Sequence, residues 1–196
     1  SPLELSFIPI HPGDILSYGG YHFEVKLLKG HTFGQCGLYE PEKKLMFVGD
    51  QLMTTIVPIV GTQETDLGML KCYLDSLGDL KHNYKDCYFL PCHYGEIRNV
   101  EKEVNRIILG YLEKCEIMKH VLEEAGTALT TRDIGVRTYG RSQGPPDYAH
   151  FASCTYIWAK TFSCMEYMMG EGFVERSERD GIIYWKAPSI HFENNR

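Results

Sequence analysis

Apolar and polar residues alternate at residues 23–27, where Phe23, Val25 and Leu27 are separated by charged positions. A period of two predicts a half-buried strand, because successive side chains of a strand point to opposite faces of the sheet. Residues 35–39 and the apolar run 45–48 predict two further strands. The short turns between these three strands favour an antiparallel meander within one sheet.

Helical periodicity dominates the middle of the chain. Leucines recur at helical spacing in residues 66–80, and we expect this helix to be capped by Thr65 or Asp66 and to pack on the sheet. A broad apolar stripe along residues 101–125 predicts a long helix, and Gly126 follows it as a stop signal.

The last third of the chain predicts a second set of elements. A short helix is expected at residues 130–136, a linker rich in glycine and proline at 140–146, and a long helix at 148–169. Residues 173–185 predict a β-hairpin, because Asp180-Gly181 is a favoured two-residue turn between apolar segments. Counting the helix before them, the order helix, helix, helix, hairpin is that of a winged-helix domain.

Three predicted strands end at loops that each carry one side chain able to bind a metal. The first strand leads to His31, the run 45–48 stops at Asp50, and the apolar run 87–90 leads to His93. An ionised carboxylate at the end of a buried strand is costly unless something pairs with it, and a metal is one such partner for Asp50. Imidazole and carboxylate are ligands that suit zinc or iron.

The loops also carry three motifs that together resemble a known family. Gly-His-Thr-x-Gly at 30–34, Val-Gly-Asp at 48–50 and Leu-Pro-x-His-x-Gly at 90–95 are similar, in order and spacing, to the last three motifs of the metallo-β-lactamase fold superfamily. The match covers roughly residues 5–100. Gln35 stands where many members carry a second histidine, a position that is not usually a ligand.

The resemblance implies a role for each of the three side chains. His31 would be a metal ligand, Asp50 would bridge two metals, and His93 would bind the second metal. The cofactor implied is zinc, two ions per intact site, with iron or manganese as alternatives. Asp50 is also the expected catalytic residue, because it would orient the attacking hydroxide between the metals.

One motif of the superfamily is missing from this sequence. His-x-His-x-Asp-His supplies most of the remaining ligands, and no two of the eight histidines are two residues apart. We therefore expect an α/β chain consisting of the second half of a metallo-β-lactamase αββα sandwich, residues 1–100, followed by a mostly helical winged-helix domain, residues 101–196. The chain would be a C-terminal portion of a longer protein, and it would bind metal weakly by itself.

Composition limits the number of domains, the classes of partner and the cellular compartment that we expect. Its 196 residues suffice for one or two compact domains, and its net charge of −6 argues against a general nucleic-acid binder. Seven cysteines, an odd number without regular spacing, predict a reducing cytoplasm rather than a disulfide framework. No apolar run approaches the length that spans a bilayer, so no membrane partner is expected.

These observations favour a binuclear zinc hydrolase that acts on an ester, thioester or similar bond of a small-molecule substrate through metal-bound hydroxide. Two alternatives stay open. The first is a non-catalytic interaction or dimerisation module, in which a homodimer could form through the C-terminal domain. The second, a nucleic-acid-processing hydrolase, is less favoured, because residues 153–169 offer only Lys160 as a basic side chain. Cys92, beside His93, is expected to be a small buried thiol.

Overall fold

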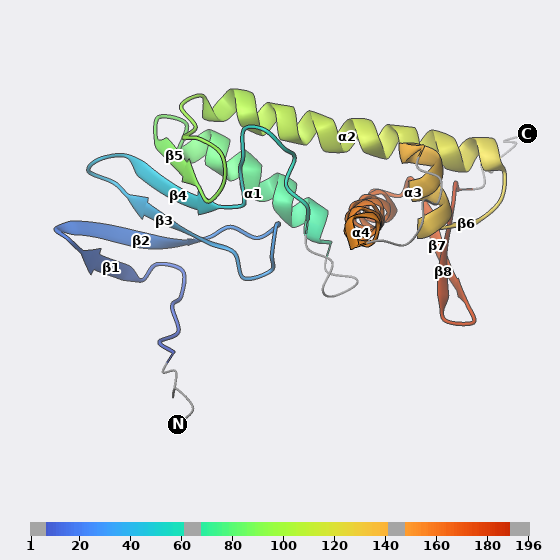
Figure 1. The fold of residues 1–196 in the computed structure, drawn as a ribbon, viewed down its shortest axis with the longest axis horizontal. Coiled ribbons are helices and arrows are strands. Elements are labelled where there is room, and N and C mark those ends of the chain that lie inside the picture. The colour runs from blue at the N-terminus through green and yellow to red at the C-terminus, as the bar shows by residue number, and fades with distance from the viewer. Residues whose placement is uncertain (1–6, 61–67, 141–147, 189–196) are drawn as a thin grey trace, which may run out of the picture.

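The computed structural model describes residues 7–60, 68–140 and 148–188. A five-stranded sheet lies at one end of the molecule, and a smaller three-stranded sheet with its own helices lies at the other (Figure 1). Helix α2, Val100–Ala125, extends from the large-sheet end of the molecule to the small-sheet end. None of the helices in the described ranges has the length and apolar character needed to cross a membrane.

The larger sheet contains the predicted meander. Its strands follow the order β1-β2-β3-β4-β5, and the first four are antiparallel neighbours; they are β1 Ile15–Tyr18, β2 Tyr21–Leu27, β3 Cys36–Glu40, β4 Leu45–Gly49 and β5 Tyr88–Pro91. The sequence did not predict β1, whose four residues are mostly exposed and lack an apolar pattern. Strand β5 pairs parallel to β4, because helix α1, Met69–Asn83, returns the chain to the same end of the sheet.

Helix α1 begins differently from the sequence prediction. Its N-cap is Gly68, in a left-handed conformation and without a side-chain hydrogen bond, so the prediction of a cap at Thr65 or Asp66 is wrong. Those two residues lie outside the described ranges. One face of α1, with Leu70, Tyr73 and Leu77, is buried in the core that also contains Met46 and Phe89 of the sheet, as its leucine spacing predicted.

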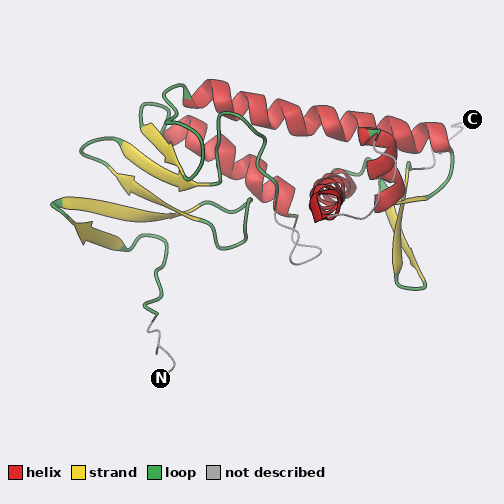
Figure 2. Cartoon of the chain, in the orientation of Figure 1, coloured by secondary structure: helices red, strands yellow, loops and turns green. Residues whose placement is uncertain are grey.

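The five-stranded sheet has one face buried against the helices and one face that is partly exposed: Val25, which pairs with Leu38 on this second face, is buried, whereas Phe47 and Tyr88 are exposed. Met46, Val48 and Phe89 belong to the same buried core as residues of α1 and α2. Figure 2 shows these helices on one side of the sheet. Alternation along the strands places Phe47 and its neighbours on the other side. We define this open sheet face by residues that register and ring contacts place together: Tyr21, Phe23, Leu38, Phe47 and Tyr88.

The C-terminal elements follow the predicted order with one addition. After α2 come β6 Leu129–Thr130, α3 Thr131–Tyr139, α4 Tyr148–Gly170, β7 Glu175–Arg179 and β8 Ile182–Lys186. Strand β6 was not predicted, and it pairs with β8 to give the order β6-β8-β7. The hairpin turn is confirmed, with Asp180 and Gly181 at φ values of 52° and 72°. The linker predicted at 140–146 lies, apart from Gly140, outside the described residues.

A single apolar core extends through both ends of the molecule. It runs from Leu28 beside the large sheet, through Tyr111 and Met118 on α2, to Trp185 on β8. Trp185 is fully buried, and its indole N–H donates to Thr131 Oγ1 at 2.9 Å. The regions before and after residue 100 are therefore packed against each other through α2.

Candidate metal centre

His31 lies in the loop that leaves β2. Gly30 before it has φ 152°, and a Cβ at this position would lie 2.2 Å from Tyr73 Cδ2, so glycine lets the loop pass close to α1. The imidazole is partly buried, with its Nδ1 2.8 Å from the carbonyl oxygen of Ile59. Ile59 belongs to the segment between β4 and α1.

Asp50 follows the last residue of β4. Gly49 turns the chain there with φ 56°, a left-handed conformation that side chains rarely adopt. Gln35 packs against Gly49, and its side-chain amide donates to the carbonyl of Val48 at 3.3 Å. The carboxylate of Asp50 is mostly buried, with a side-chain exposure of 25%.

His93 lies in the loop after β5, the strand parallel to β4. The parallel pairing brings the C-terminal ends of both strands to one edge of the sheet, so the loops of Asp50 and His93 are neighbours. The backbone N–H of Cys92 joins them by donating to the carbonyl of Gly49 at 3.0 Å. Cys92 itself is exposed, so the prediction of a buried thiol is wrong: its side chain lies on a loop beyond the sheet.

The three side chains predicted from the sequence converge on the Asp50 carboxylate. His31 Nε2 lies 3.6 Å from Asp50 Oδ2, and His93 Nε2 lies 3.6 Å from Asp50 Oδ1. Oδ1 is buried and has no hydrogen-bond partner among the described residues. A buried carboxylate oxygen without a donor is costly, and a cation near it would offset that cost.

The two histidines approach different oxygens of the carboxylate. Within residues 7–60, 68–140 and 148–188, no three His, Cys, Asp or Glu side chains gather tightly enough to hold one metal ion. The arrangement instead provides two positions, each with one histidine and one carboxylate oxygen. A structural zinc site has four protein ligands and a catalytic one has three, so each position here is incomplete.

Sequence reasoning missed the groups that hold His31 in place. Gln51 is fully buried, and its side-chain amide donates to Lys29 O at 3.1 Å and Ser76 Oγ at 3.0 Å. Its Oε1 also accepts the backbone N–H of His31 at 3.5 Å. The only signal in the sequence was a polar residue following the Gly-Asp step, which has no specific meaning by itself.

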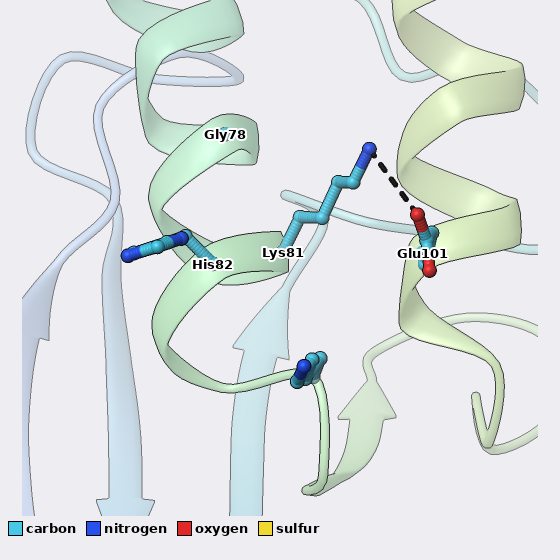
Figure 3. A pocket seen from close by; sticks show the side chains of 5 residues that line it. Gly78, Lys81, His82 and Glu101 are labelled. Atoms are coloured by element: carbon cyan, nitrogen blue, oxygen red, sulfur yellow. Dashed lines mark ion pairs between the residues drawn. The ribbon is translucent and has the colours of Figure 1, made fainter.

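A separate surface pocket lies away from these loops. Gly78, Lys81, His82, Lys85 and Glu101 line a cavity of about 280 Å³ between the end of α1 and the start of α2. Figure 3 shows Lys81 reaching toward Glu101, with Nζ and Oε1 3.5 Å apart, while His82 points away from both. Lys81 also donates to Asn105 at 2.9 Å, so its charge is already paired. The pocket shares no residue with the loops of His31, Asp50 and His93.

Known structures share the architecture described above. A metallo-β-lactamase family protein from Thermus thermophilus superposes with a TM-score of 0.77 over 94% of this chain, at 22% sequence identity. A β-lactamase domain protein from Burkholderia ambifaria gives a TM-score of 0.78 over 93% of this chain, at 19% identity. The chain has the metallo-β-lactamase fold.

The chain spans only part of these relatives. It covers 55% of the Thermus protein and 53% of the Burkholderia protein. Among curated sequences, hydroxyacylglutathione hydrolase GloC from Haemophilus influenzae is 50% identical over 40 residues, which are 20% of this chain and 19% of GloC. No protein-family model matches the sequence. The architecture of the Thermus and Burkholderia proteins is thus shared over nearly the whole chain, while roughly half of each of these relatives has no counterpart here.

Proposed function

We propose that this chain is part of a metal-dependent hydrolase in which His31, Asp50 and His93 bind two divalent metal ions. The observation that carries the proposal is the convergence of the three side chains, with each histidine 3.6 Å from a different oxygen of Asp50. Asp50 would bridge the two metals, His31 would bind one and His93 the other. Zinc fits this mixture of imidazole and carboxylate, and iron and manganese are alternatives.

The donor set fits such metals chemically. When bound, they would supply an activated water and electrophilic stabilisation of the developing negative charge. The chain's own contribution is orientation. A carbonyl oxygen can only accept, so the Ile59 contact keeps the ring proton of His31 on Nδ1 and leaves the lone pair of Nε2 facing Asp50.

The substrate we propose is a small molecule with an ester, thioester or similar bond. The match to GloC supports this choice, because GloC is by name a hydrolase of hydroxyacylglutathione.

We also propose that residues 1–100 form the second half of the αββα sandwich and residues 101–196 a winged-helix-like domain. Support for the second domain comes from α2, α3 and α4 followed by the β7–β8 hairpin. A packing or dimerisation role suits it better than nucleic-acid binding. Helix α4 exposes Tyr156 and Trp158, and Lys160, the one Lys or Arg in its sequence, lies over the ring of Tyr111 at 4.8 Å.

Metal content is the decisive test of this proposal. We expect two zinc ions per chain in a longer protein that contains this sequence together with a His-x-His-x-Asp-His segment. The 196-residue chain should lose its zinc on dialysis, because each of its two positions has only two ligands. Elemental analysis of both proteins after the same dialysis would measure the difference. Stoichiometric zinc in the short chain would contradict the split site, and no metal in either protein would favour a non-catalytic module.

The open sheet face provides a second prediction. Phe47 is 40% exposed and Tyr88 43%, whereas a sheet in a two-layer fold buries such residues against another layer. We therefore expect the isolated chain to self-associate through this face. Replacing Phe47 by glutamate should raise the dissociation constant roughly five- to tenfold, since it removes apolar contact area worth about 1 kcal/mol or more.

Sedimentation equilibrium would measure that change. Ile182→Glu is the matched control, because Ile182 is 48% exposed but lies on β8, far from the open sheet face. Equal association of the wild-type chain and the Phe47→Glu variant would show that this face is not where the chain associates.

A further inference from the structure

Two separate contacts hold His31, one at its backbone and one at its ring. The backbone N–H donates to Gln51 Oε1 at 3.5 Å, and Nδ1 lies 2.8 Å from the carbonyl oxygen of Ile59, an acceptor that can pair only with a protonated Nδ1. These two partners lie on different segments, 20 and 28 residues after His31. The orientation of the imidazole therefore depends on where both segments are placed.

Each of the two segments is fixed by a tyrosine from a helix. The hydroxyl of Tyr73 on α1 donates to the carbonyl of Gln51 at 2.8 Å. The hydroxyl of Tyr111 on α2 donates to the carbonyl of Pro58, the residue before Ile59, at 2.7 Å. Both tyrosines are fully buried, and their rings pack edge to face with centroids 5.9 Å apart.

Both hydroxyls are suited to act as constant hydrogen-bond donors. Burial raises the pKa of Tyr73 and of Tyr111 well above the ordinary value for tyrosine, so both hydroxyls keep their protons and remain donors at any physiological pH. Losing either donor would leave a buried carbonyl without this partner, which favours movement of the segment.

We propose that Tyr73 and Tyr111 are positioning residues that hold the Nε2 atom of His31 in place for metal binding. The proposal rests on the function proposed above, and it extends the site beyond its ligands. Tyr111 lies after the proposed domain boundary at residue 100, so helix α2 would contribute to the geometry of a centre whose ligands all come from the first domain.

A purely structural role for the two tyrosines makes a different prediction. Buried tyrosines with satisfied hydroxyls are common in protein cores, and removing a hydroxyl would then lower stability without changing His31. The distinguishing feature here is that both acceptor carbonyls belong to segments that contact His31 directly.

The test uses Tyr111→Phe and Tyr73→Phe in the metal-free 196-residue chain. Nitrogen-15 NMR of the His31 ring, at a pH where the ring is neutral, reports which nitrogen carries the proton. We expect a single Nδ1–H tautomer in the wild-type chain and a mixture of the two tautomers in each variant. Zinc titration followed on the same resonances should show an affinity lower by about tenfold in each variant.

Tyr139→Phe provides the matched control. Tyr139 lies on α3 and is half-buried, and its hydroxyl has no hydrogen-bond partner among the residues that the structure describes. Its removal should leave the tautomer of His31 and the zinc affinity unchanged.

The outcomes separate this inference from the proposed function. Folded Tyr111→Phe and Tyr73→Phe chains that both keep the single tautomer would overturn the positioning role, even if the chain binds zinc. A tautomer mixture in the variants of a chain that never binds zinc would support the orientation of His31 by the tyrosines while refuting the metal site. If one variant does not fold, the other decides.

Discussion

Replacing Gly30 by alanine is expected to destabilise the chain by about 3–5 kcal/mol, from a steric clash combined with backbone strain. The added Cβ would lie 2.2 Å from Tyr73 Cδ2 and 2.7 Å from both Cβ and Cγ of Tyr73. The clash cannot be relieved by a side-chain rotation alone, because Tyr73 is fully buried and its hydroxyl is bound to Gln51. At φ 152° the backbone is also strained for any residue but glycine.

Urea unfolding followed by circular dichroism would measure the change. Gly34→Ala is the control within the same loop, since a Cβ there meets no atom within 4 Å and its φ is ordinary. We expect that variant to stay within about 1 kcal/mol of the wild-type chain, as surface substitutions generally do. A Gly30→Ala chain as stable as Gly34→Ala would mean that the loop of His31 does not pack against α1 as described.

Replacing Asp50 by asparagine is expected to lower zinc affinity by at least about 100-fold, more than the loss of a residue that only orients a ligand. The substitution removes the negative charge that both proposed metal positions share. It keeps the shape of the side chain, and Oδ1 has no hydrogen bond to lose among the described residues. The fold should therefore persist while binding fails.

Competition with a coloured chelator would measure the affinity, in this chain and in a longer protein that completes the site. Asp14→Asn is the control, because Asp14 also faces a histidine: its Oδ2 lies 3.7 Å from His11 Nδ1 on an exposed turn. Undiminished zinc binding by the Asp50→Asn variant would remove Asp50 from the ligand set and, with it, the bridging role.

The sequence predicted where the strands end, because each strand end is marked by neighbouring residues. An apolar run followed by Gly-Asp both ends β4 and places Asp50, and the same logic placed His31 and His93 after β2 and β5. The parallel pairing of β4 and β5 brings the loops of Asp50 and His93 to one edge, and the resemblance to a known family anticipated their meeting. Helix α2 and the Asp180-Gly181 turn were likewise predicted from local pattern.

The features that the sequence did not predict depend mostly on contacts between residues far apart in the chain. Ile59 binds His31 through its carbonyl, a group that every residue has, so no side chain marks it in the sequence. Tyr111 reaches Pro58 across 53 positions, and an apolar stripe predicts its burial but not the partner of its hydroxyl. The sequence did not predict Gly68 as the N-cap of α1, because Thr and Asp are the more favourable capping residues. Strand β1 was not predicted, because it is held mainly by pairing with β2.

Helix α2 has a consequence for how the chain can be divided. Its 26 residues span about 39 Å at 1.5 Å per residue. Near its start it binds the large-sheet region, where Arg106 donates to Met53 O and Tyr111 to Pro58 O, and it also packs against α3, α4 and β8. One continuous helix therefore joins the two regions. Neither region can rotate relative to the other unless α2 bends or loses its packing contacts. The proposed boundary near residue 100 would therefore not act as a hinge.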